Sequence, residues 1–179
     1  MSLHSSVVDT LGDWRPTDPA QDALRLAVLA FVLARPDACR RACVPGHITA
    51  STLVLDDSGR RAALTLHPRL KRWVQLGGHC EEGDADIAAA ALREATEESG
   101  IAGVVLDPVP VAVHVHALTC SLGEPTHHLD VQFVARAPEG ADLVCSDESL
   151  DLQWWPLSEL PDGVDFGLRQ LIGAAGARI

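Results

Sequence analysis

Residues 93–101 read REATEESGI and place three carboxylates at the end of a predicted helix. The residues before them, DADIAAAAL, are strong helix formers behind an aspartate cap, and Gly100 is a natural stop just past the last turn. Glu97 and Glu98 therefore lie where the helix dipole is negative and favours cations. Glu94 and Glu98 are like charges four residues apart, which repel each other. Carboxylates gathered at the negative end of a helix cost stability, and an unfavourable local arrangement of this kind often marks a functional site.

The composition predicts one domain with a substantial core. The chain has 179 residues, of which 47% are hydrophobic, and its mean hydropathy is +0.11. Its net charge is −11 and its pI is near 5.0. A chain this acidic, with no basic run, is a poor binder of nucleic acid or of an anionic membrane. An anionic substrate would need a metal ion or a local cluster of cations.

The cysteines and the N-terminus predict a cytoplasmic protein. Five cysteines, an odd number, contain no C-x-x-C motif and are typical of reduced, buried thiols. The first residues, MSLHSSVVDT, lack a basic region followed by an apolar core, and so do not form a signal peptide. The longest apolar run, residues 24–34, contains Arg25 and is too short to span a bilayer. We therefore expect no membrane association.

The order of predicted elements favours an α+β fold with a mixed sheet covered by helices. Residues 1–16 look irregular, and Asp18 caps a helix that ends near Ala34. Pro108 and Pro110 are expected to break the extended segment 103–120 into two pieces. Because strands and helices do not alternate strictly, a doubly wound sheet is not indicated. The other predicted strands are 47–56, 60–67, 73–76, 128–137 and 150–157, and the other helices are 86–99 and 165–174.

The central helix carries a carboxylate cluster on one side. At 100° per residue, Glu94, Glu97 and Glu98 share a side, opposite a face of small residues that can pack on a sheet. Arg93 precedes Glu97 by one turn and can pair with it. Hard cations such as Mg²⁺ bind carboxylate and carbonyl oxygens, so a divalent ion would supply the missing compensation. The alternative is an ordinary acidic face exposed to solvent.

The segment GGHCEEGDADIAAAALREATEESGI, residues 77–101, resembles the Nudix box, Gly-x5-Glu-x7-Arg-Glu-U-x-Glu-Glu-x-Gly-U, where U is aliphatic. Ala95 fills an aliphatic slot, and Asp84 fills the acidic slot in a turn one residue longer than the standard motif. The remaining matches are Arg93, Glu94, Glu97, Glu98, Gly100 and Ile101. The resemblance implies a Nudix-type α/β/α sandwich with a mixed β-sheet over residues 45–179. Residues 1–44 would form a helical extension packed on that domain.

The resemblance also implies an activity, namely hydrolysis of a pyrophosphate bond in a nucleoside diphosphate linked to another group. The partner would be a small nucleotide derivative, and the cofactor Mg²⁺ or Mn²⁺. Carried over, Glu97 and Glu98 are metal ligands, and Glu94 is a ligand or the base that activates water. Arg93 orients the glutamates, and the carbonyl of Gly77 is a further ligand. The chemistry is consistent, because metals must neutralise a polyanionic pyrophosphate.

Further site residues come from the loops. In many Nudix enzymes a glutamate of a late loop acts as base or extra ligand, and Glu148 is the candidate here, with Asp147 and Glu124 as alternatives. The dense cationic cluster beside the Gly-Gly turn is predicted to contact substrate phosphates. That set is Arg69, Lys71, Arg72 and, lining the site, His79.

Other residues are assigned no chemistry. His114 and His116 alternate on one predicted strand and His127 and His128 begin another, but no spacing demands a zinc site. Cys80 lacks the pattern of a base beside it that a nucleophile needs. The tryptophans, predicted to belong to the core and the sheet surface, are Trp73, Trp154 and Trp155.

Two alternative functions remain beside hydrolysis. One is a non-catalytic Nudix-like module that senses nucleotides, although such modules usually lose box glutamates and this chain keeps all three. The other is an isomerase of prenyl diphosphates, which shares the fold but needs a catalytic cysteine and a histidine-rich metal site. The substrate, the number of metals, the general base and the oligomeric state are left open by the sequence.

Overall fold

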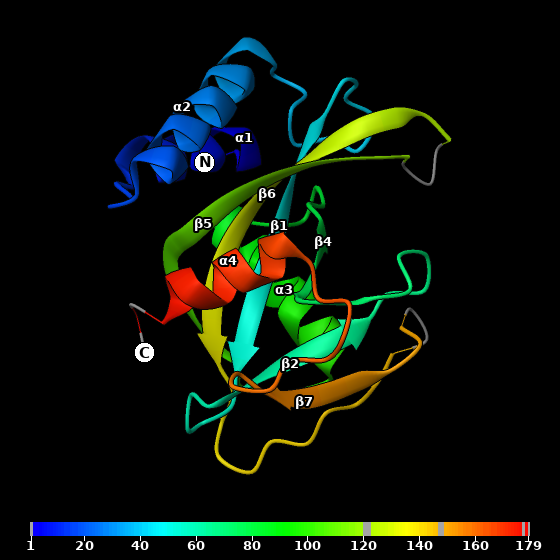
Figure 1. Ribbon diagram of the computed structural model, residues 1–179. Helices are drawn as coiled ribbons and strands as arrows, with labels where there is room; N and C mark the ends of the chain where they lie inside the picture. The colour runs from blue at the N-terminus through cyan, green and yellow to red at the C-terminus, as the bar shows by residue number, and fades with distance from the viewer. Residues whose placement is uncertain (1, 120–122, 147–148, 177, 179) are drawn as a thin grey trace.

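A computed structural model of the chain describes residues 2–119, 123–146, 149–176 and 178. Figure 1 shows helices on both sides of a strongly twisted sheet. In chain order the elements are α1 (Leu3–Asp13), α2 (Pro19–Ala34), β1 (His47–Leu55), β2 (Arg61–Leu66), β3 (Trp73–Val74), β4 (Leu76–His79), α3 (Ile87–Ser99), β5 (Val105–Thr119), β6 (Pro125–Arg136), β7 (Leu152–Pro156) and α4 (Phe166–Ala175).

The sheet is mixed, which confirms the predicted fold class. Its strand order is β3-β2-β1-β6-β5, while β4 also pairs with β1 and β7 pairs with β2. The β1–β6 pair is parallel and the other pairs are antiparallel. Helix α4 lies over one face and α3 over the other, so the domain is an α/β/α sandwich (Figure 1).

Strand β1 divides its side chains between the two faces. Ala50 packs with the small residues of α3, and the Thr52 hydroxyl donates to the Ala91 carbonyl at 3.1 Å. On the opposite face Leu53 and Leu55 join the core beneath α4. Because side chains alternate along a strand, the earlier odd-numbered residues also lie on the α4 face. These residues are His47, Thr49 and Ser51, and all three are buried.

Residues near the N-terminus form a helix, so the prediction of an irregular segment is wrong. Ser2 and Ser5 make a reciprocal capping box at the start of α1. Val7 and Leu11, one turn apart, are fully buried against the rest of the core. The helix is therefore fixed by a serine pair and by tertiary packing, since the segment has few strong helix formers.

Strand β5 is continuous, so the predicted break into two pieces is also wrong. Its pairing with β6 shifts register between Asp107 and Ala112. Pro108 and Pro110 lie inside this shift, where a residue without an N–H group loses no ladder hydrogen bond. The prolines thus locate an irregularity in one strand.

The two N-terminal helices contact the domain through polar and apolar groups. The Ser6 hydroxyl accepts a hydrogen bond from the Ile87 backbone N–H at the start of α3, at 3.1 Å. Gln21 of α2 accepts from the Val113 N–H at 2.8 Å and donates to the Val113 carbonyl at 3.2 Å. Val28 shares a core cluster with Phe133 of β6. The division of the chain after residue 44 stays a prediction.

None of the helices in the described part of the chain is long and apolar enough to cross a membrane.

We predict that Gln21→Ala destabilises the protein, because it leaves the amide and carbonyl of Val113 without their side-chain partner. Two lost hydrogen bonds to a partly buried backbone should lower the free energy of unfolding by about 1–3 kcal/mol. Gln153→Ala is the matched control, since the side chain of Gln153 is exposed and its amide donates to the Asp151 carboxylate two residues away. Urea unfolding of both variants measures the difference. Equal stabilities would show that α2 is not held through Gln21.

Candidate active site

The Gly-Gly turn of the Nudix-like box is built on the short strand β4. Its antiparallel pairing with β1 places Gly77 opposite Ser51 and Gly78 opposite Ala50. Gly77 has φ +151°, and a side chain there would collide with Ser51. Only glycine therefore allows β4 to approach β1 this closely.

Helix α3 follows after a turn and ends where the sequence predicts. Asp86 caps it by accepting a hydrogen bond from the Ala89 N–H at 2.7 Å. Gly100 ends it in the left-handed conformation at φ +67°. The buried face of α3 consists of Ile87, Ala90, Ala91, Ala95 and Ser99, so its glutamates are left on the other side.

Arg93 connects the turn, the strand and the carboxylates. Its guanidinium forms a bidentate pair with Asp84, at 2.9 and 3.1 Å, and also donates to the His79 carbonyl at 3.0 Å. It donates further to Glu94 at 2.9 Å and to Glu97 at 3.1 Å. The hydrogen bonds that the guanidinium donates to Asp84 and Glu94 raise the pKa of Arg93, so the guanidinium stays charged. These contacts agree with the orienting role predicted for Arg93, which stays a prediction.

Asp84 occupies the acidic position of the box, and the extra residue in the turn does not prevent its pairing. The turn closes when the Glu81 N–H donates to the Asp84 carboxylate at 2.7 Å. The Asp84 side chain is only 4% exposed. Burial by itself would raise the pKa of Asp84, but the hydrogen bonds from Arg93 and from the Glu81 backbone lower it. Asp84 is therefore a charged anchor for Arg93, a role the sequence did not assign.

Glu94 and Glu98 face β4, whereas Glu97 is exposed to solvent. The Glu98 carboxylate accepts a hydrogen bond from the Gly77 N–H at 2.8 Å. A Cβ atom on Gly78 would lie 2.7 Å from a Glu94 carboxylate oxygen, so this glycine makes room for that group. The Glu97 side chain is 61% exposed and pairs with Arg93. Arg93 and the Gly77 amide thus offset part of the negative charge that the glutamates add at the C-terminal end of α3.

These groups fit a hard divalent cation. Two box carboxylates turn toward one short strand, and the missing side chain at Gly78 leaves room for the Glu94 carboxylate against it. Carboxylate and carbonyl oxygens are the ligands that Mg²⁺ and Mn²⁺ prefer. The ligand roles of Gly77, Glu94, Glu97 and Glu98 stay predictions.

The cationic loop before β3 lies near the start of α4. Arg72 pairs with Asp165, the cap of α4, at 3.3 Å. Lys71 has φ +53°, and the His67 ring nitrogen accepts from the Arg69 N–H at 3.2 Å within the same tight turn. Phosphate binding by Arg69, Lys71 and Arg72 stays a prediction.

The predicted late-loop acids are only partly described. Glu148 and Asp147 lie outside the described residues, so their roles stay predictions. Glu124, the other alternative, is exposed just before β6.

The tryptophans pack as the sequence predicts. Trp73 and Trp155 meet edge to face with ring centroids 5.3 Å apart and pack against the core beneath α4. Trp154 joins a second core cluster and lies beneath the Arg61 guanidinium, 5.7 Å from the ring centroid.

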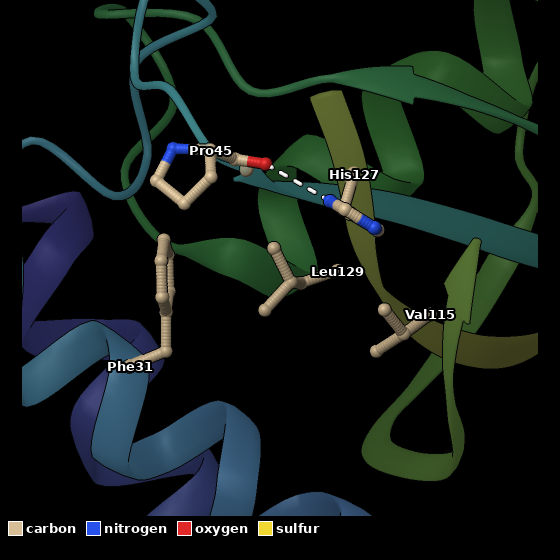
Figure 2. Close-up of a pocket in the computed structure, with 6 residues that line it drawn as sticks. Phe31, Pro45, Val115, His127 and Leu129 are labelled. Atoms are coloured by element: carbon tan, nitrogen blue, oxygen red, sulfur yellow. Dashed lines mark hydrogen bonds between the residues drawn. The ribbon is translucent and has the colours of Figure 1, made fainter. Parts of the chain in front are cut away.

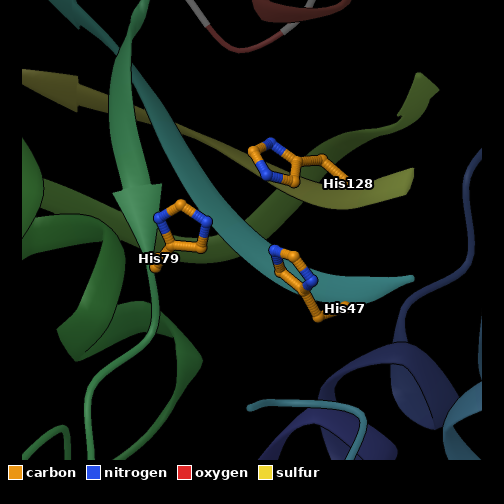
Figure 3. Close-up of side chains that lie close together, drawn as sticks. All are labelled: His47, His79 and His128. Carbon is orange, nitrogen blue, oxygen red and sulfur yellow. The ribbon is translucent and has the colours of Figure 1, made fainter. Parts of the chain in front are cut away.

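Three histidines converge from neighbouring strands, an arrangement that the sequence did not predict. His47 of β1, His79 of β4 and His128 of β6 surround one space (Figure 3). Their ring centroids are 4.9–5.1 Å apart. His116 of β5 follows, with its ring centroid 5.2 Å from that of His128. The phosphate contact that the sequence predicts for His79 stays a prediction, and the sequence assigns His47 no role.

Of the three histidines, His47 is buried, and His79 and His128 are partly buried. His47 is 0% exposed. Burial lowers the pKa of His47, and the nearby Cys43 backbone offsets part of this effect. Burial, together with the charge of Arg41, lowers the pKa of His79 to about 4. Burial and the neighbouring histidines lower the pKa of His128 to about 3, so all three rings are neutral at pH 7.

A small pocket lies away from the box, between α2 and the start of β6 (Figure 2). Its volume is about 150 Å³, and its lining is apolar apart from His127, whose Nδ1 donates to the Pro45 carbonyl at 3.1 Å. Sites for small organic ligands usually occupy about 300–1,000 Å³, so this pocket is too small for a nucleotide.

The fold and the strand–turn–helix site define a domain of the pyrophosphate-hydrolase type, with acidic side chains presented beside a Gly-Gly turn. The family model described as NUDIX domain matches residues 45–173. The chain therefore belongs to the Nudix family, and this membership supports the prediction of a pyrophosphohydrolase.

Solved structures share this fold at low identity. A NUDIX-family hydrolase from Clostridium perfringens is 21% identical with a TM-score of 0.57, covering 74% of this chain and 98% of its own. The NUDIX domain of Shewanella oneidensis NrtR, solved with ADP ribose, is 20% identical with a TM-score of 0.55, covering 83% and 97%. A UDP-X diphosphatase is 13% identical with a TM-score of 0.55, covering 100% and 98%. No curated protein matches the chain.

We predict that Asp84→Asn lowers stability in a pH-dependent way. Asparagine cannot accept both guanidinium bonds, so at pH 7 the free energy of unfolding should fall by about 1.5–3 kcal/mol. The pKa of Asp84 is lowered in the folded state. Its contribution is therefore complete above the ordinary aspartate pKa of about 3.9 and is lost as the pH falls through the lower folded value.

Denaturant unfolding between pH 3 and pH 7 measures the difference in unfolding free energy between the two proteins. This range includes the pKa of an ordinary aspartate, about 3.9. The gap between the wild type and Asp84→Asn should narrow toward the acid end. Asp142→Asn, in an exposed loop, is the control and should stay within about 0.5 kcal/mol of the wild type. A gap that is independent of pH would contradict the assigned charge pair.

Proposed function

We propose that the protein hydrolyses a pyrophosphate bond in a nucleoside diphosphate linked to another group, with Mg²⁺ or Mn²⁺ as cofactor. The observation that carries this proposal is the set of contacts of Arg93. One guanidinium, anchored on Asp84, holds Glu94 and Glu97 beside the Gly-Gly turn. Family membership over residues 45–173 supports the same activity.

The metal would be held by oxygen ligands of the box, namely Glu94, Glu97, Glu98 and the Gly77 carbonyl. When bound, a divalent ion neutralises the pyrophosphate, lowers the pKa of an attacking water and stabilises the leaving phosphate. The net charge of −11 makes this neutralisation necessary, because the protein as a whole repels an anionic substrate.

The chain's own residues fix the geometry. Asp84 holds Arg93, and Arg93 in turn limits the movement of Glu94 and Glu97. The Gly77 amide fixes Glu98 from the strand side. Positioning of this kind accounts for much of the catalysis of phosphoryl transfer, where the protein does little covalent chemistry.

Substrate phosphates are proposed to meet the cationic loop. Arg72 is anchored by Asp165 and is 41% exposed, so its remaining donors can reach an anion. Arg69 and Lys71 belong to the same turn. A guanidinium suits this task because it presents several donors in one plane. Glu148 is retained as the proposed base or extra ligand of the late loop.

A non-catalytic module that binds nucleotides is the second candidate. The NUDIX domain of NrtR was solved with ADP ribose, which shows that this fold is found with a bound nucleoside diphosphate derivative. The three box glutamates favour catalysis over binding alone. Binding of ADP ribose without any release of product would support the module.

An isomerase of prenyl diphosphates needs a histidine-rich metal site and a catalytic cysteine, and this chain offers a candidate only for the first. The histidine cluster supplies the histidine-rich site, but the cysteine beside the box is not activated. Burial raises the pKa of the Cys80 thiol, and the charges of Cys39 and Asp84 raise it further. Conversion of a prenyl diphosphate without release of phosphate would support isomerisation.

We predict that Glu94→Gln, Glu97→Gln and Glu98→Gln each lower kcat by roughly a hundredfold or more, as removal of a key electrostatic group does. The assay is a panel of nucleotide derivatives with Mg²⁺, with the products identified by mass. Glu139→Gln, in the exposed turn after β6, is the control and should keep full activity. Near-normal turnover in Glu97→Gln or Glu98→Gln would reject the assigned site.

We predict that Gly78→Ala reduces activity while leaving stability nearly unchanged. The new Cβ would lie 2.7–2.8 Å from the Glu94 carboxylate, and the flexible side chain can move away. A displacement of about 1 Å should lower kcat by roughly ten- to a hundredfold. Gly83→Ala, in the same turn, meets nothing within 4 Å and is the matched control. Equal kcat values for the two variants would show that the position of Glu94 is unimportant.

A further inference from the structure

We propose that His47, His79 and His128 form a binding site for a transition-metal ion of the Zn²⁺ class, separate from the carboxylate site of the box. This inference does not depend on the proposed hydrolysis. It is carried by the convergence of one buried and two partly buried imidazoles, and by buried Nε2 atoms of His79 and His128 that have no hydrogen-bond partner among the described residues.

Strand pairing fixes the positions of the three residues. His47 is directly opposite His128 in the parallel β1–β6 pair, and His79 pairs with Thr49, the next residue of β1 on the same face. The potential ligand atoms of the three histidines all lie within 4.8 Å of one another. Tetrahedral zinc with Zn–N bonds of about 2.0–2.1 Å needs nitrogens about 3.4 Å apart. Rotations of the side chains can close this difference while the sheet stays unchanged.

The nitrogens of the cluster lack the partners that buried polar groups normally have. The Nε2 atoms of His79 and His128 are buried and have no hydrogen-bond partner within the described structure, and the same holds for both ring nitrogens of His47 apart from the nearby Cys43 backbone. Burial of such groups without a partner costs free energy, so most buried polar atoms in proteins are paired. Three such rings around one space are explained together by an ion that accepts their lone pairs.

The ligand type distinguishes this site from the box. Imidazole suits zinc and neighbouring transition metals, whereas Mg²⁺ prefers oxygen. The nearby carboxylate of Asp130 is already bonded to Thr49 at 2.9 Å, Ser51 at 2.6 Å and Gln132 at 3.0 Å. The cluster therefore offers nitrogen alone, and three protein ligands leave one position open to water or another ligand.

The two sites would share strand β4. His79 follows Gly77 and Gly78 directly, and its carbonyl accepts a hydrogen bond from Arg93. His79 thus contributes its ring to one site and its backbone to the other. A bound transition-metal ion would help to fix the end of β4 from which the box begins.

Zinc binding by the full-length protein tests the inference directly. The protein is stripped with EDTA, incubated with Zn²⁺ alone and desalted, and its metal content is measured by mass spectrometry. The wild type should retain one zinc ion per chain. His47→Asn and His128→Asn should each weaken zinc binding by roughly a hundredfold. Loss of a residue that only supports a metal ligand weakens binding by about 10–100-fold, and loss of a ligand itself should reach the upper end of that range.

Two matched variants separate this site from other histidines and from the box. His127→Asn changes the neighbouring histidine, which is exposed and bonds to Pro45, and should leave zinc binding unchanged. The double variant Glu97→Gln, Glu98→Gln removes box charges and should also keep its zinc. Absence of zinc in the wild type, or equal binding by His128→Asn, would overturn the proposal.

X-ray absorption of the zinc-loaded wild type gives a second answer that does not depend on any variant folding. The expected spectrum shows scattering from three imidazole ligands. Sulfur ligands would instead place the ion on thiols such as Cys80 and Cys39, which is near enough to raise the pKa of Cys80. Oxygen ligands alone would place it on the box. Either result would overturn the histidine site, while the proposed hydrolysis would be unaffected.

Discussion

The bidentate pair between Arg93 and Asp84 is the interaction on which the candidate active site depends. It joins the turn after β4 to the middle of α3, and the same guanidinium reaches the His79 carbonyl, Glu94 and Glu97. A nearly buried carboxylate and a charged guanidinium cannot separate without leaving each other poorly solvated. The position of the helix relative to the strand, and hence that of the glutamates, follows from this pair. The turn can therefore be one residue longer than the standard motif without moving the site.

The alternation of side chains along β1 determines where the polar groups lie. One set of residues packs against the small face of α3, which brings the helix close to the sheet. The other set begins with His47, Thr49 and Ser51 and continues as Leu53 and Leu55 beneath α4. The α4 face of the sheet is thus polar at one end and apolar at the other. Helix α4 covers the apolar end, and the histidines and Asp130 gather at the polar end.

The local parts of this structure could be predicted from the sequence, whereas the parts made by pairing between distant segments could not. The box, its helix and the hairpin of β1 and β2 depend on caps, glycines and alternation within short stretches. Helix α1 was missed because its stability comes from a serine capping box and from the burial of Val7 and Leu11. The histidine cluster was missed because His47 and His128 meet only through the parallel register of β1 and β6. Sequence spacing carries no information about that register, and a histidine at the start of a strand has no distinguishing signal of its own.

The charges around β4 explain how acidic groups can stay at an unfavourable helix end. Arg93 and the Gly77 amide compensate the box carboxylates from one side, yet one guanidinium pairs with four acids, including Asp84 and Glu81. The site therefore keeps excess negative charge, which attracts a divalent cation. His79 of this strand, and His47 and His128 of β1 and β6, are neutral at pH 7, because burial lowers the pKa of their rings. Two neighbouring positions thus differ in both charge and donor atom: oxygen ligands with negative charge favour Mg²⁺ or Mn²⁺, and neutral nitrogens favour zinc. A strand only four residues long would keep two such ions apart, because its backbone would serve the proposed magnesium site and a side chain the proposed zinc site.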